Sequence, residues 1–422
     1  MDTTSKGNRL HIALLGRTNV GKSSLLNLIL GQDISITSPV AGTTTDVVEK
    51  AMELLPLGPV LFLDTAGLDD ISELCGARLK KTAKVIDRAD VIILVTEADT
   101  WTDYEEGVLS ESQNRKIPML VVINKIDLRK PSSDHLIFLQ SKSERTLTVS
   151  CSDQSQRQNY LDSLKQHLLE VAPADFAGTP SLIGDLLAPG GLAVLVVPID
   201  LEAPKGRLIL PQVQTIRDAL DCDAMTLVVK ERELAAALAN LRNPPAIVVT
   251  DSQAILKVTA DVPNAIPVTT FSILFARQKS DLIVMARGTA AIESLQPGDR
   301  ILIAEACSHH ALEDDIGRVK IPRWLRQYVG GDLKIDISSG RDYPDDLKKY
   351  KLILHCGACM MNRREMLTRM RKAQEAGVAI TNHGVAISFL QGVIKRSLAP
   401  FPSSLQAFEK EMADKKTGKI ND

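Results

Sequence analysis

The sequence predicts an α/β protein of three domains, with parallel strands in the last of them. Short apolar runs such as 10–15 alternate along the chain with segments of helical periodicity such as 24–30, which is the pattern of strand–helix units. At 422 residues the chain is too long for one ordinary core. A stretch rich in proline, glycine and alanine at 172–191 ends the first domain. We therefore expect domains at 1–172, 173–264 and 265–422.

The composition is that of a globular protein, with 44% hydrophobic and 24% charged residues. A formal net charge of -2 lacks the basic excess that nucleic acid or an anionic membrane attracts. The N-terminus, MDTTSKGNRL, has no apolar signal core, and no apolar run approaches the roughly 18 residues of a membrane span. We expect a cytoplasmic protein without a nucleic-acid or membrane partner.

A phosphate-binding loop separates the first apolar strand from the first helix. The segment GRTNVGKSS (16–24) has the GxxxxGK[ST] pattern. Gly16 and Gly21 let the backbone N–H groups of the loop face the phosphates at the positive end of the helix. Lys22 is expected to reach the β and γ phosphates and Ser23 to ligate magnesium. The expected nucleotide-binding residues of this loop are Gly16, Asn19, Val20, Gly21, Lys22, Ser23 and Ser24.

Two later motifs add to the site, and the second of them selects guanine as the base. The apolar run 60–63 leads into Asp64-Thr65-Ala66-Gly67, where Asp64 would hold magnesium through water and the Gly67 amide would sense the γ phosphate. A second apolar run ends in NKID, 124–127. The Asp127 carboxylate can accept hydrogen bonds from the N1–H and exocyclic amine of guanine, a pair that adenine does not offer. Asn124 and Lys125 complete this motif, so the sequence predicts GTP.

Two further loops complete the expected site. Ser150 and Cys151 follow an apolar stretch at the place of the last base-contacting loop. In AGTTTD (41–46) a threonine is expected to cover the γ phosphate and complete the magnesium shell. Thr44 is our choice, with Thr43 and Thr45 left open. The residues expected to act in hydrolysis are Lys22, Thr44, Asp64 and Gly67.

The motifs GxxNxGKS, GTT, DTAG and NKxD, in this order, resemble those of the Era and MnmE type of GTP-binding proteins. That resemblance implies that Asn19 helps to bind a potassium ion beside the phosphates, so that potassium stimulates hydrolysis. Leu68 stands where other GTPases have a glutamine that orients water, and slow hydrolysis is therefore expected. Thr45 replaces the arginine of the usual TTRD, which leaves the details of this loop open.

The second domain is expected to be a small α/β unit. Apolar strands at 192–199, 225–230 and 246–250 alternate with helical patterns at 213–220 and 233–241. It contains no dense cluster of titratable or ligand-type residues. We expect a dimerisation or spacer role.

The third domain carries cysteines and histidines where strands end. The strand patterns 300–305, 351–355 and 377–380 run into ACSHH, HCGAC and TNHG respectively. Because the ends of parallel strands converge on one crevice, Cys307, Cys356 and Cys359 can meet there. Three thiolates favour a soft metal, either zinc or an iron–sulfur cluster. Other potential ligands nearby are His309, His310, Glu313, Asp314 and His355.

Cys307-Ser308-His309, followed later by His355-Cys356-Gly357-Ala358-Cys359, is similar to the CxH and HCxxC signature of the FeFe-hydrogenase maturation GTPases, the HydF family. The segment DDIGRVKIPRW (314–324) and the order of the domains strengthen the resemblance. Ala358 departs from it, since related sequences often have glycine there.

The resemblance implies a GTP-hydrolysing scaffold, or chaperone, with a 4Fe-4S cluster on Cys307, Cys356 and Cys359. One iron would be exchangeable, and a diiron active-site precursor would be carried there and delivered to the apo-hydrogenase. The implied partners are the radical-SAM hydrogenase maturases, the apo FeFe-hydrogenase and a second copy of the chain. The candidates for the exchangeable iron position are His309, Glu313, Asp314 and His355.

Three rival interpretations remain. A ribosome-assembly or tRNA-modification GTPase with a structural metal site fits the first domain equally well, but predicts a basic RNA-binding module that the sequence lacks. A redox enzyme would more usually have four thiolates around its cluster. A regulatory switch with structural zinc would be separated from the favoured interpretation by metal analysis.

Overall fold

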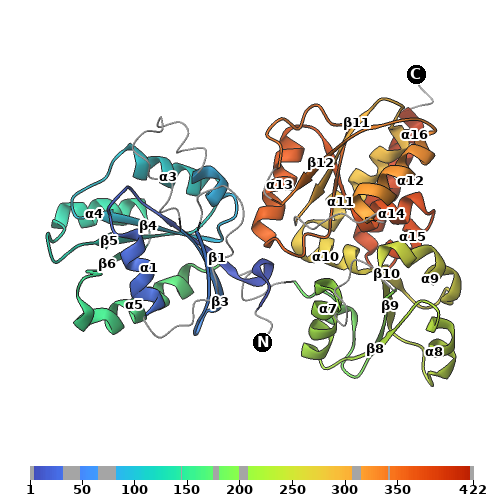
Figure 1. Cartoon of the computed structure of the whole chain (residues 1–422), viewed down its shortest axis with the longest axis horizontal. Coiled ribbons are helices and arrows are strands. Elements are labelled where there is room, and N and C mark those ends of the chain that lie inside the picture. The colour runs from blue at the N-terminus through green and yellow to red at the C-terminus, as the bar shows by residue number, and fades with distance from the viewer. Residues whose placement is uncertain are drawn as a thin grey trace. The chain divides into compact units, whose positions relative to one another are not determined.

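The structure, a computed structural model, describes residues 4–31, 48–64, 82–143, 145–173, 180–198, 208–306, 315–340 and 343–418. The chain divides into two compact units, Met1–Thr179 and Pro180–Asp422. Figure 1 shows strands and helices alternating along the chain in both units. The predicted α/β class is confirmed. Within the described residues, no helix combines the length and apolar character needed to span a bilayer.

The first unit is built on a six-stranded sheet of order β2-β3-β1-β4-β5-β6. Neighbouring strands are parallel except β2 and β3, which are antiparallel. The strands are β1 (Leu10–Leu15), β2 (Val48–Leu54), β3 (Gly58–Asp64), β4 (Val91–Glu97), β5 (Met119–Asn124) and β6 (Thr146–Thr148). The described helices include α1 (Lys22–Leu30), α3 (Asp103–Asn114), α4 (Ser133–Lys142) and α5 (Arg157–Val171).

Alternation along β1 divides the core of this unit between the two faces of the sheet. Leu14 packs in a cluster with residues of α1 and α5, whereas Leu15 packs in a cluster with residues of α3 and α4. This is the two-faced burial that parallel strands covered by helices require. The carboxyl ends of β1, β3 and β5 thereby lie at the same edge of one sheet, with β4 between β1 and β5.

The second unit contains two parallel four-stranded sheets, of orders β10-β9-β7-β8 and β12-β11-β13-β14. The strands of the first are β7 (Leu192–Val196), β8 (Met225–Val229), β9 (Ile247–Thr250) and β10 (Val268–Thr270). Those of the second are β11 (Arg300–Glu305), β12 (Lys334–Ser339), β13 (Leu352–His355) and β14 (Ala379–Asn382). The parallel strands predicted for the last part of the chain are confirmed.

Helices surround and join these two sheets (Figure 1). They are α7 (Leu210–Asp221), α8 (Leu234–Asn240), α9 (Ile255–Asp261), α10 (Phe271–Lys279), α11 (Leu282–Thr289), α12 (Ile321–Val329), α13 (Arg363–Glu375), α14 (His383–Leu390), α15 (Ile394–Leu398) and α16 (Pro402–Gly418). A short π-helix, Ile316–Lys320, precedes α12. Helix α10 contacts both β10 and β14 as well as α14, so these two helices connect the sheets.

The two sheets share their cores. One hydrophobic cluster includes Leu195 of β7 and Leu302 of β11, and the other includes Val194 and Ile303 from the same two strands. The sheet of β7 to β10 also extends past the boundary expected at residue 264, because β10 pairs with β9. A division into second and third domains stays a prediction, and the sheet pairing supports placing it after β10.

Candidate functional site

The phosphate loop follows β1 directly and leads into α1, in the strand–loop–helix order that the motif requires. Gly16 has φ +154° and Gly21 has φ +98°. A Cβ atom on Gly16 would lie 2.5 Å from the carbonyl oxygen of Val95, and one on Gly21 would lie 2.1 Å from Nδ2 of Asn124. Only glycine fits this close approach of the loop to β4 and β5.

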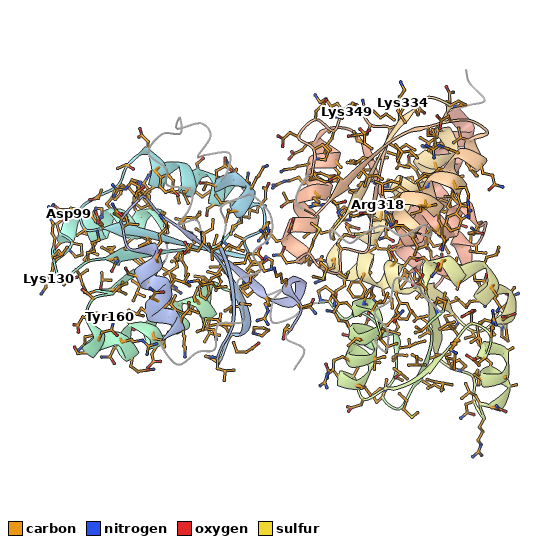
Figure 2. All side chains as sticks on the ribbon, in the orientation of Figure 1. Asp99, Lys130, Tyr160, Arg318, Lys334 and Lys349 are labelled. Carbon is orange, nitrogen blue, oxygen red and sulfur yellow. The ribbon has the colours of Figure 1, made fainter. Side chains whose placement is uncertain are left out.

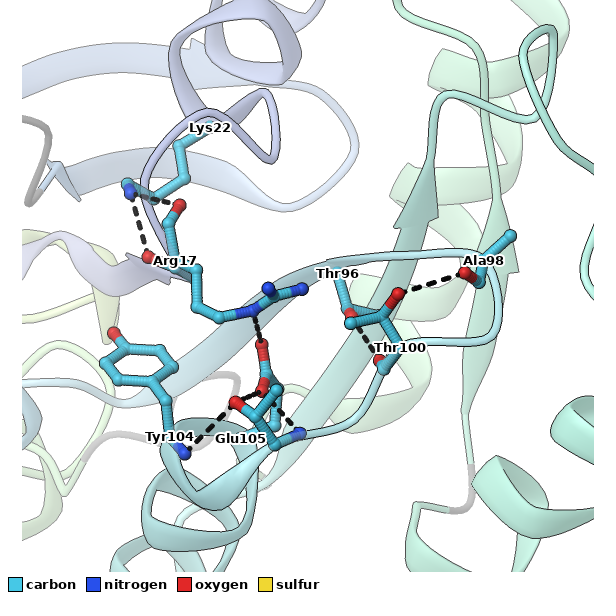
Figure 3. Close-up of polar contacts among 9 residues, drawn as sticks. Arg17, Lys22, Thr96, Ala98, Thr100, Tyr104 and Glu105 are labelled. Carbon is cyan, nitrogen blue, oxygen red and sulfur yellow. Dashed lines mark hydrogen bonds and ion pairs between the residues drawn. The ribbon is translucent and has the colours of Figure 1, made fainter.

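Lys22 lies inside the loop, where its side chain is 4% exposed. Its Nζ donates to the carbonyl oxygens of Gly16 at 2.8 Å and Arg17 at 3.0 Å (Figure 3). The loop therefore holds the ammonium group at the place where its backbone curls toward α1. A bound polyphosphate would offer the same group stronger, charged acceptors.

Asn124, which is 2% exposed, connects three parts of the expected nucleotide site. Its Nδ2 donates to the carbonyl oxygen of Val20 at 3.0 Å, and its Oδ1 accepts from the N–H of Cys151 at 3.2 Å. The side chain thus joins the phosphate loop to the loop after β6. Lys125, the next residue, has a left-handed backbone at φ +62° and pairs with Glu97 at 2.5 Å.

Two serines in the loop after β6 stabilise the negative charge of Asp127. Ser150 donates its hydroxyl to Oδ1 of Asp127 at 2.6 Å, and Ser152 donates to Oδ2 at 3.1 Å. These hydrogen bonds hold the pKa of Asp127 below its usual value, and the bond from Ser150 has the largest effect. An ionised carboxylate is a pure acceptor, which is what the two donors of guanine need. Burial raises the pKa of Cys151 to about 12, so this residue contributes its backbone N–H rather than a thiolate.

The structure describes only some of the residues expected to bind magnesium. Asp64 ends β3, is 4% exposed and lies opposite Leu14 of β1. Ser23 and Ser24 are exposed in the first turn of α1, and Asn19 is exposed with φ +65°. Thr43, Thr44, Thr45, Gly67 and Leu68 lie outside the described residues. The expected magnesium and potassium ligands therefore stay predictions.

An ion pair that we did not expect anchors the phosphate loop to α3 (Figure 3). Arg17 Nε donates to Oε1 of Glu105 at 2.8 Å, and the Glu105 side chain is fully buried. The other oxygen of Glu105 accepts from the backbone N–H of Thr102 at 2.9 Å in a capping box. The T-x-x-E pattern at 102–105 is a signal for that cap, but not for the arginine 88 positions away.

A second site lies where the strands of the last sheet end. Cys356 follows β13, and its Sγ accepts from the backbone N–H of Ala306, just after β11, at 3.1 Å. Burial raises the pKa of the Cys356 thiol, while this N–H and that of Ala358 oppose the rise. Ala358 has φ +55°, a left-handed conformation that glycine adopts with less strain. Glycine would therefore be accommodated at this position with less strain than alanine.

Cys356 and Cys359 line one cavity of about 220 Å³. Glu305, at the end of β11, and His383, at the start of α14, line it too. Segments that follow β9 and β10 also line the cavity. Its described lining residues are Ile209, Pro211, Asp251, Ser252, Phe271, Ser272, Phe275, Glu305, Asp315, Ile316, Gly317, Cys356, Gly357, Cys359, His383 and Ile387.

His355 is fully buried, and both of its ring nitrogens are engaged. Nε2 lies 3.2 Å from Nη1 of Arg369, and Nδ1 lies 3.0 Å from the carbonyl oxygen of Cys356. Because a guanidinium can only donate, Nε2 accepts and Nδ1 carries the proton. Burial, with Arg369 beside the ring, lowers the pKa of His355 to about 3.

Glu305 forms an ion pair with Arg318. Arg318, which Figure 2 labels, belongs to the π-helix. Arg318 Nη2 donates to Oε2 of Glu305 at 2.8 Å and to the hydroxyl of Ser339 at 2.8 Å. The carboxylate is 2% exposed, so the pair offsets the cost of burying its charge. Sequence reasoning gave neither residue a role, although Glu305 ends the strand pattern 300–305 and Arg318 lies within the segment 314–324.

Cys307, His309, His310, Glu313 and Asp314 lie outside the described residues. Within the ranges that the structure does describe, no three histidine, cysteine or acidic side chains gather as a metal site. The structure thus brings Cys356 and Cys359 to one cavity, and the meeting of all three cysteines stays a prediction.

Three family models match different parts of the chain. Residues 11–125 match a 50S ribosome-binding GTPase model. Residues 182–280 match the hydrogen maturase F dimerization domain, and residues 283–400 match the hydrogen maturase F tetramerization domain. The two hydrogen maturase F models together cover just over half of the chain. The chain belongs to the hydrogen maturase F family.

This finding confirms the resemblance based on the cysteine motifs, and it places a GTPase domain at the N-terminus of a hydrogen maturase F chain. The part expected to bind an iron–sulfur cluster matches a tetramerization domain. The expected dimer is thus supported only in general terms: the two matched models are oligomerisation domains, one for dimers and one for tetramers.

Curated relatives resemble this hydrogen maturase F chain in its GTPase domain. GTPase Der of Nitratiruptor sp. is 36% identical over 136 residues, 31% of this chain and 29% of that protein. The tRNA modification GTPase MnmE of Bordetella petrii is 42% identical over 122 residues, 28% of this chain and 26% of that protein. The chain spans less than a third of the length of either. Aquifex aeolicus Era, a solved structure, matches at 21% identity and a TM-score of 0.31, over 52% of this chain and 93% of that one.

Proposed function

We propose that this hydrogen maturase F protein is a GTP-hydrolysing scaffold that carries a diiron precursor to apo FeFe-hydrogenase. The observation that carries the proposal is the shared cavity of Cys356 and Cys359 at the ends of parallel strands. Cys307, which follows β11 in the sequence, would supply the third thiolate of a 4Fe-4S cluster. The hydrogen maturase F matches support the same assignment.

The residues present fit such a cluster. The Sγ atom of Cys356 already accepts a backbone N–H from Ala306, and such bonds stabilise the negative charge on cluster sulfur. Ala358 supplies a second N–H to the same atom. When bound, a cluster with three cysteine ligands supplies one open iron position, to which a ligand of the cargo can attach.

For that iron position the candidates stay His309, Glu313, Asp314 and His355. The contacts of His355 argue against it, because Arg369 and the carbonyl group of Cys356 occupy its nitrogens. The three others belong to the segment between β11 and the π-helix.

The GTPase domain would act as a switch. Hydrogen bonds within the domain position Lys22, Asn124 and Asp127, and we propose Mg²⁺ at Ser23, Thr44 and Asp64. Potassium at Asn19 would neutralise charge that develops during hydrolysis, which we expect to be slow. GTP can control the distant cavity only if the two sites favour different conformations.

The proposed partners are the radical-SAM hydrogenase maturases and the apo-hydrogenase. Binding and release of these partners are the steps that GTP hydrolysis would gate. The dimerization and tetramerization matches support assembly of several copies.

The test is metal content and EPR after anaerobic reconstitution. We expect near four irons and four sulfides per chain in the wild type and a reduced 4Fe-4S signal. A triple alanine variant of Cys307, Cys356 and Cys359 should lose both, whereas Cys222→Ser, outside the pattern, should retain both. Stoichiometric zinc without that signal would overturn the scaffold and favour a GTPase with a structural metal site, as in the ribosome-assembly or tRNA-modification alternative.

A further inference from the structure

One buried carboxylate joins the phosphate loop to helix α3. Glu105 lies in the first turn of α3 with its side chain fully buried, and its Oε1 accepts from Nε of Arg17 at 2.8 Å. Taking a carboxylate out of water is costly unless a cation pairs with it. Among the described residues Arg17 is the cation paired with Glu105. The second residue of the phosphate loop is therefore drawn to α3.

The two oxygens of Glu105 have different partners. Oε2 accepts from the backbone N–H of Thr102 at 2.9 Å and from the hydroxyl of the same residue at 2.5 Å. These contacts complete the capping box of α3, which needs only one carboxylate oxygen. The contact of Oε1 with Arg17 is thus not explained by the formation of α3.

Arg17 connects Glu105 to the lysine of the phosphate loop. Its carbonyl oxygen accepts from Nζ of Lys22 at 3.0 Å, beside the carbonyl oxygen of Gly16 at 2.8 Å. Figure 3 shows these contacts one after another, from Lys22 through Arg17 to Glu105. The Nη2 atom of Arg17 is buried without a hydrogen-bond partner in the described part of the chain. The bond from Nε to Glu105 is therefore the contact that fixes the guanidinium group.

The loop that leads into α3 is itself fixed to the sheet. Thr96 of β4 is fully buried, and its hydroxyl donates to the carbonyl oxygen of Thr100 at 2.9 Å (Figure 3). The residue before it, Val95, is the one whose carbonyl oxygen would lie 2.5 Å from a Cβ on Gly16. The phosphate loop thus contacts the end of β4 directly and a second time through Glu105.

We infer that Glu105 is a positioning residue of the GTPase, because through Arg17 it holds the carbonyl groups that orient Lys22 toward the β and γ phosphates. A lysine at this place interacts with the phosphates and with the charge of the transferred phosphoryl group, whereas guanine is expected at Asp127. Glu105 should therefore affect the binding of phosphates rather than of the base. The inference deepens the GTPase part of the proposed function and requires no metal in the second unit.

The test compares nucleotides that differ only in their phosphates. Glu105→Gln keeps the size of the side chain and one oxygen for Thr102, but its NH2 group cannot accept from Arg17. In the full-length protein, the affinities for GTP and GDP should fall about tenfold or more. The affinity for GMP, which has no β phosphate, should stay unchanged. Displacement of a fluorescent guanine nucleotide measures each affinity, and kcat for GTP should fall as well.

Glu111→Gln is the matched control, since it makes the same change on the same helix at a side chain that is 42% exposed. It should bind each nucleotide as the wild type does. Because Glu105 acts through Arg17, the double variant Arg17→Gln with Glu105→Gln should bind GDP no more weakly than Glu105→Gln alone. If Glu105→Gln fails to fold, this double variant, in which neither charge remains, takes its place.

Affinities for GDP and GMP that fall by the same factor would show a general loss of structure and overturn the inference. Undiminished affinity for GDP in Glu105→Gln would overturn it too. A wild type that binds no GTP would instead sink the GTPase part of the proposed function, and this inference with it. Failure of the scaffold proposal in the metal analysis would leave the role of Glu105 intact.

Discussion

Single residues in the nucleotide site are positioned by hydrogen bonds to neighbouring residues. Ser150 and Ser152 fix both carboxylate oxygens of Asp127, and Asn124 holds two loops. The polar groups that read the base are thus set by neighbours from β5 and β6. Changes at these positions should alter recognition rather than folding.

Replacing Asp127 with asparagine should lower GTP affinity by about 100-fold or more, because guanine then loses its paired acceptor. Xanthosine nucleotides should gain affinity, since the new amide can donate to the carbonyl at C2. Displacement of a fluorescent guanine nucleotide measures both effects. Asp134→Asn, at an exposed position of α4, is the matched control. Unchanged GTP affinity in Asp127→Asn would contradict this account.

Cys151 should resist alkylation in the folded protein at pH 8. Burial raises the pKa of its thiol to about 12, so the reactive thiolate appears only as the pH approaches that value. In the chain unfolded with urea, the same thiol should titrate near 8.5 and react readily. Mass spectrometry after a timed exposure to iodoacetamide compares the two states. Equal modification of both would show that the thiol is not shielded.

Much of the nucleotide site could be predicted from sequence because its residues are adjacent in short motifs. The long-range contacts could not, since Arg17 finds Glu105, and Arg369 finds His355, only after the chain has folded. His383 falls between these cases, because its segment was predicted for the crevice and its side chain lines the cavity of Cys356 and Cys359.

At the scale of elements, apolar strands were easier to predict than strands that charged residues interrupt. The run 10–15 became β1 with the same bounds, because a strand buried on both faces is a continuous apolar run. The edge strands β2 and β12 were missed, since charges interrupt both of them, as in VEKAMEL and KIDISS. The short β10 gave no signal either.

Strand β8 is the last of its sheet among the described strands, and it carries exposed apolar side chains. Met225 is 54% and Val228 is 41% exposed, within the stretch that matches a dimerization domain. An apolar edge strand invites pairing with a second copy. We expect Met225→Lys with Val228→Lys to weaken dimers by about tenfold or more, because like charges then face one another.

Light scattering coupled to size-exclusion chromatography measures this change over a dilution series. Leu256→Lys, at a 51% exposed position of α9, is the control for an added surface charge in the same unit. Dimers of undiminished affinity in the double variant would exclude β8 from the interface.

At the scale of the whole molecule, each unit has its own hydrophobic core, so we expect each unit to have its own free energy of unfolding. The hydrophobic clusters of the first unit contain no residue beyond 172, and those of the second begin at 182. Each unit also holds one of the two tryptophans, Trp101 and Trp324. Fluorescence can therefore follow each unit by itself.

We expect two thermal transitions, of which only the one reported by Trp101 responds to nucleotide. Mg·GDP at 100 times its Kd should stabilise the first unit by about 2.7 kcal/mol and raise that midpoint. Trp324→Phe and Trp101→Phe variants separate the signals. A shift of both midpoints by the same amount would mean that the units unfold together.

Asn124 has a further consequence, which concerns how substitutions in this domain combine. Its two hydrogen bonds join the phosphate loop to the loop after β6, so the two loops share one anchor. Replacing Asn124 with alanine should therefore loosen both loops at once, and its effect should not simply add to that of a change within either loop.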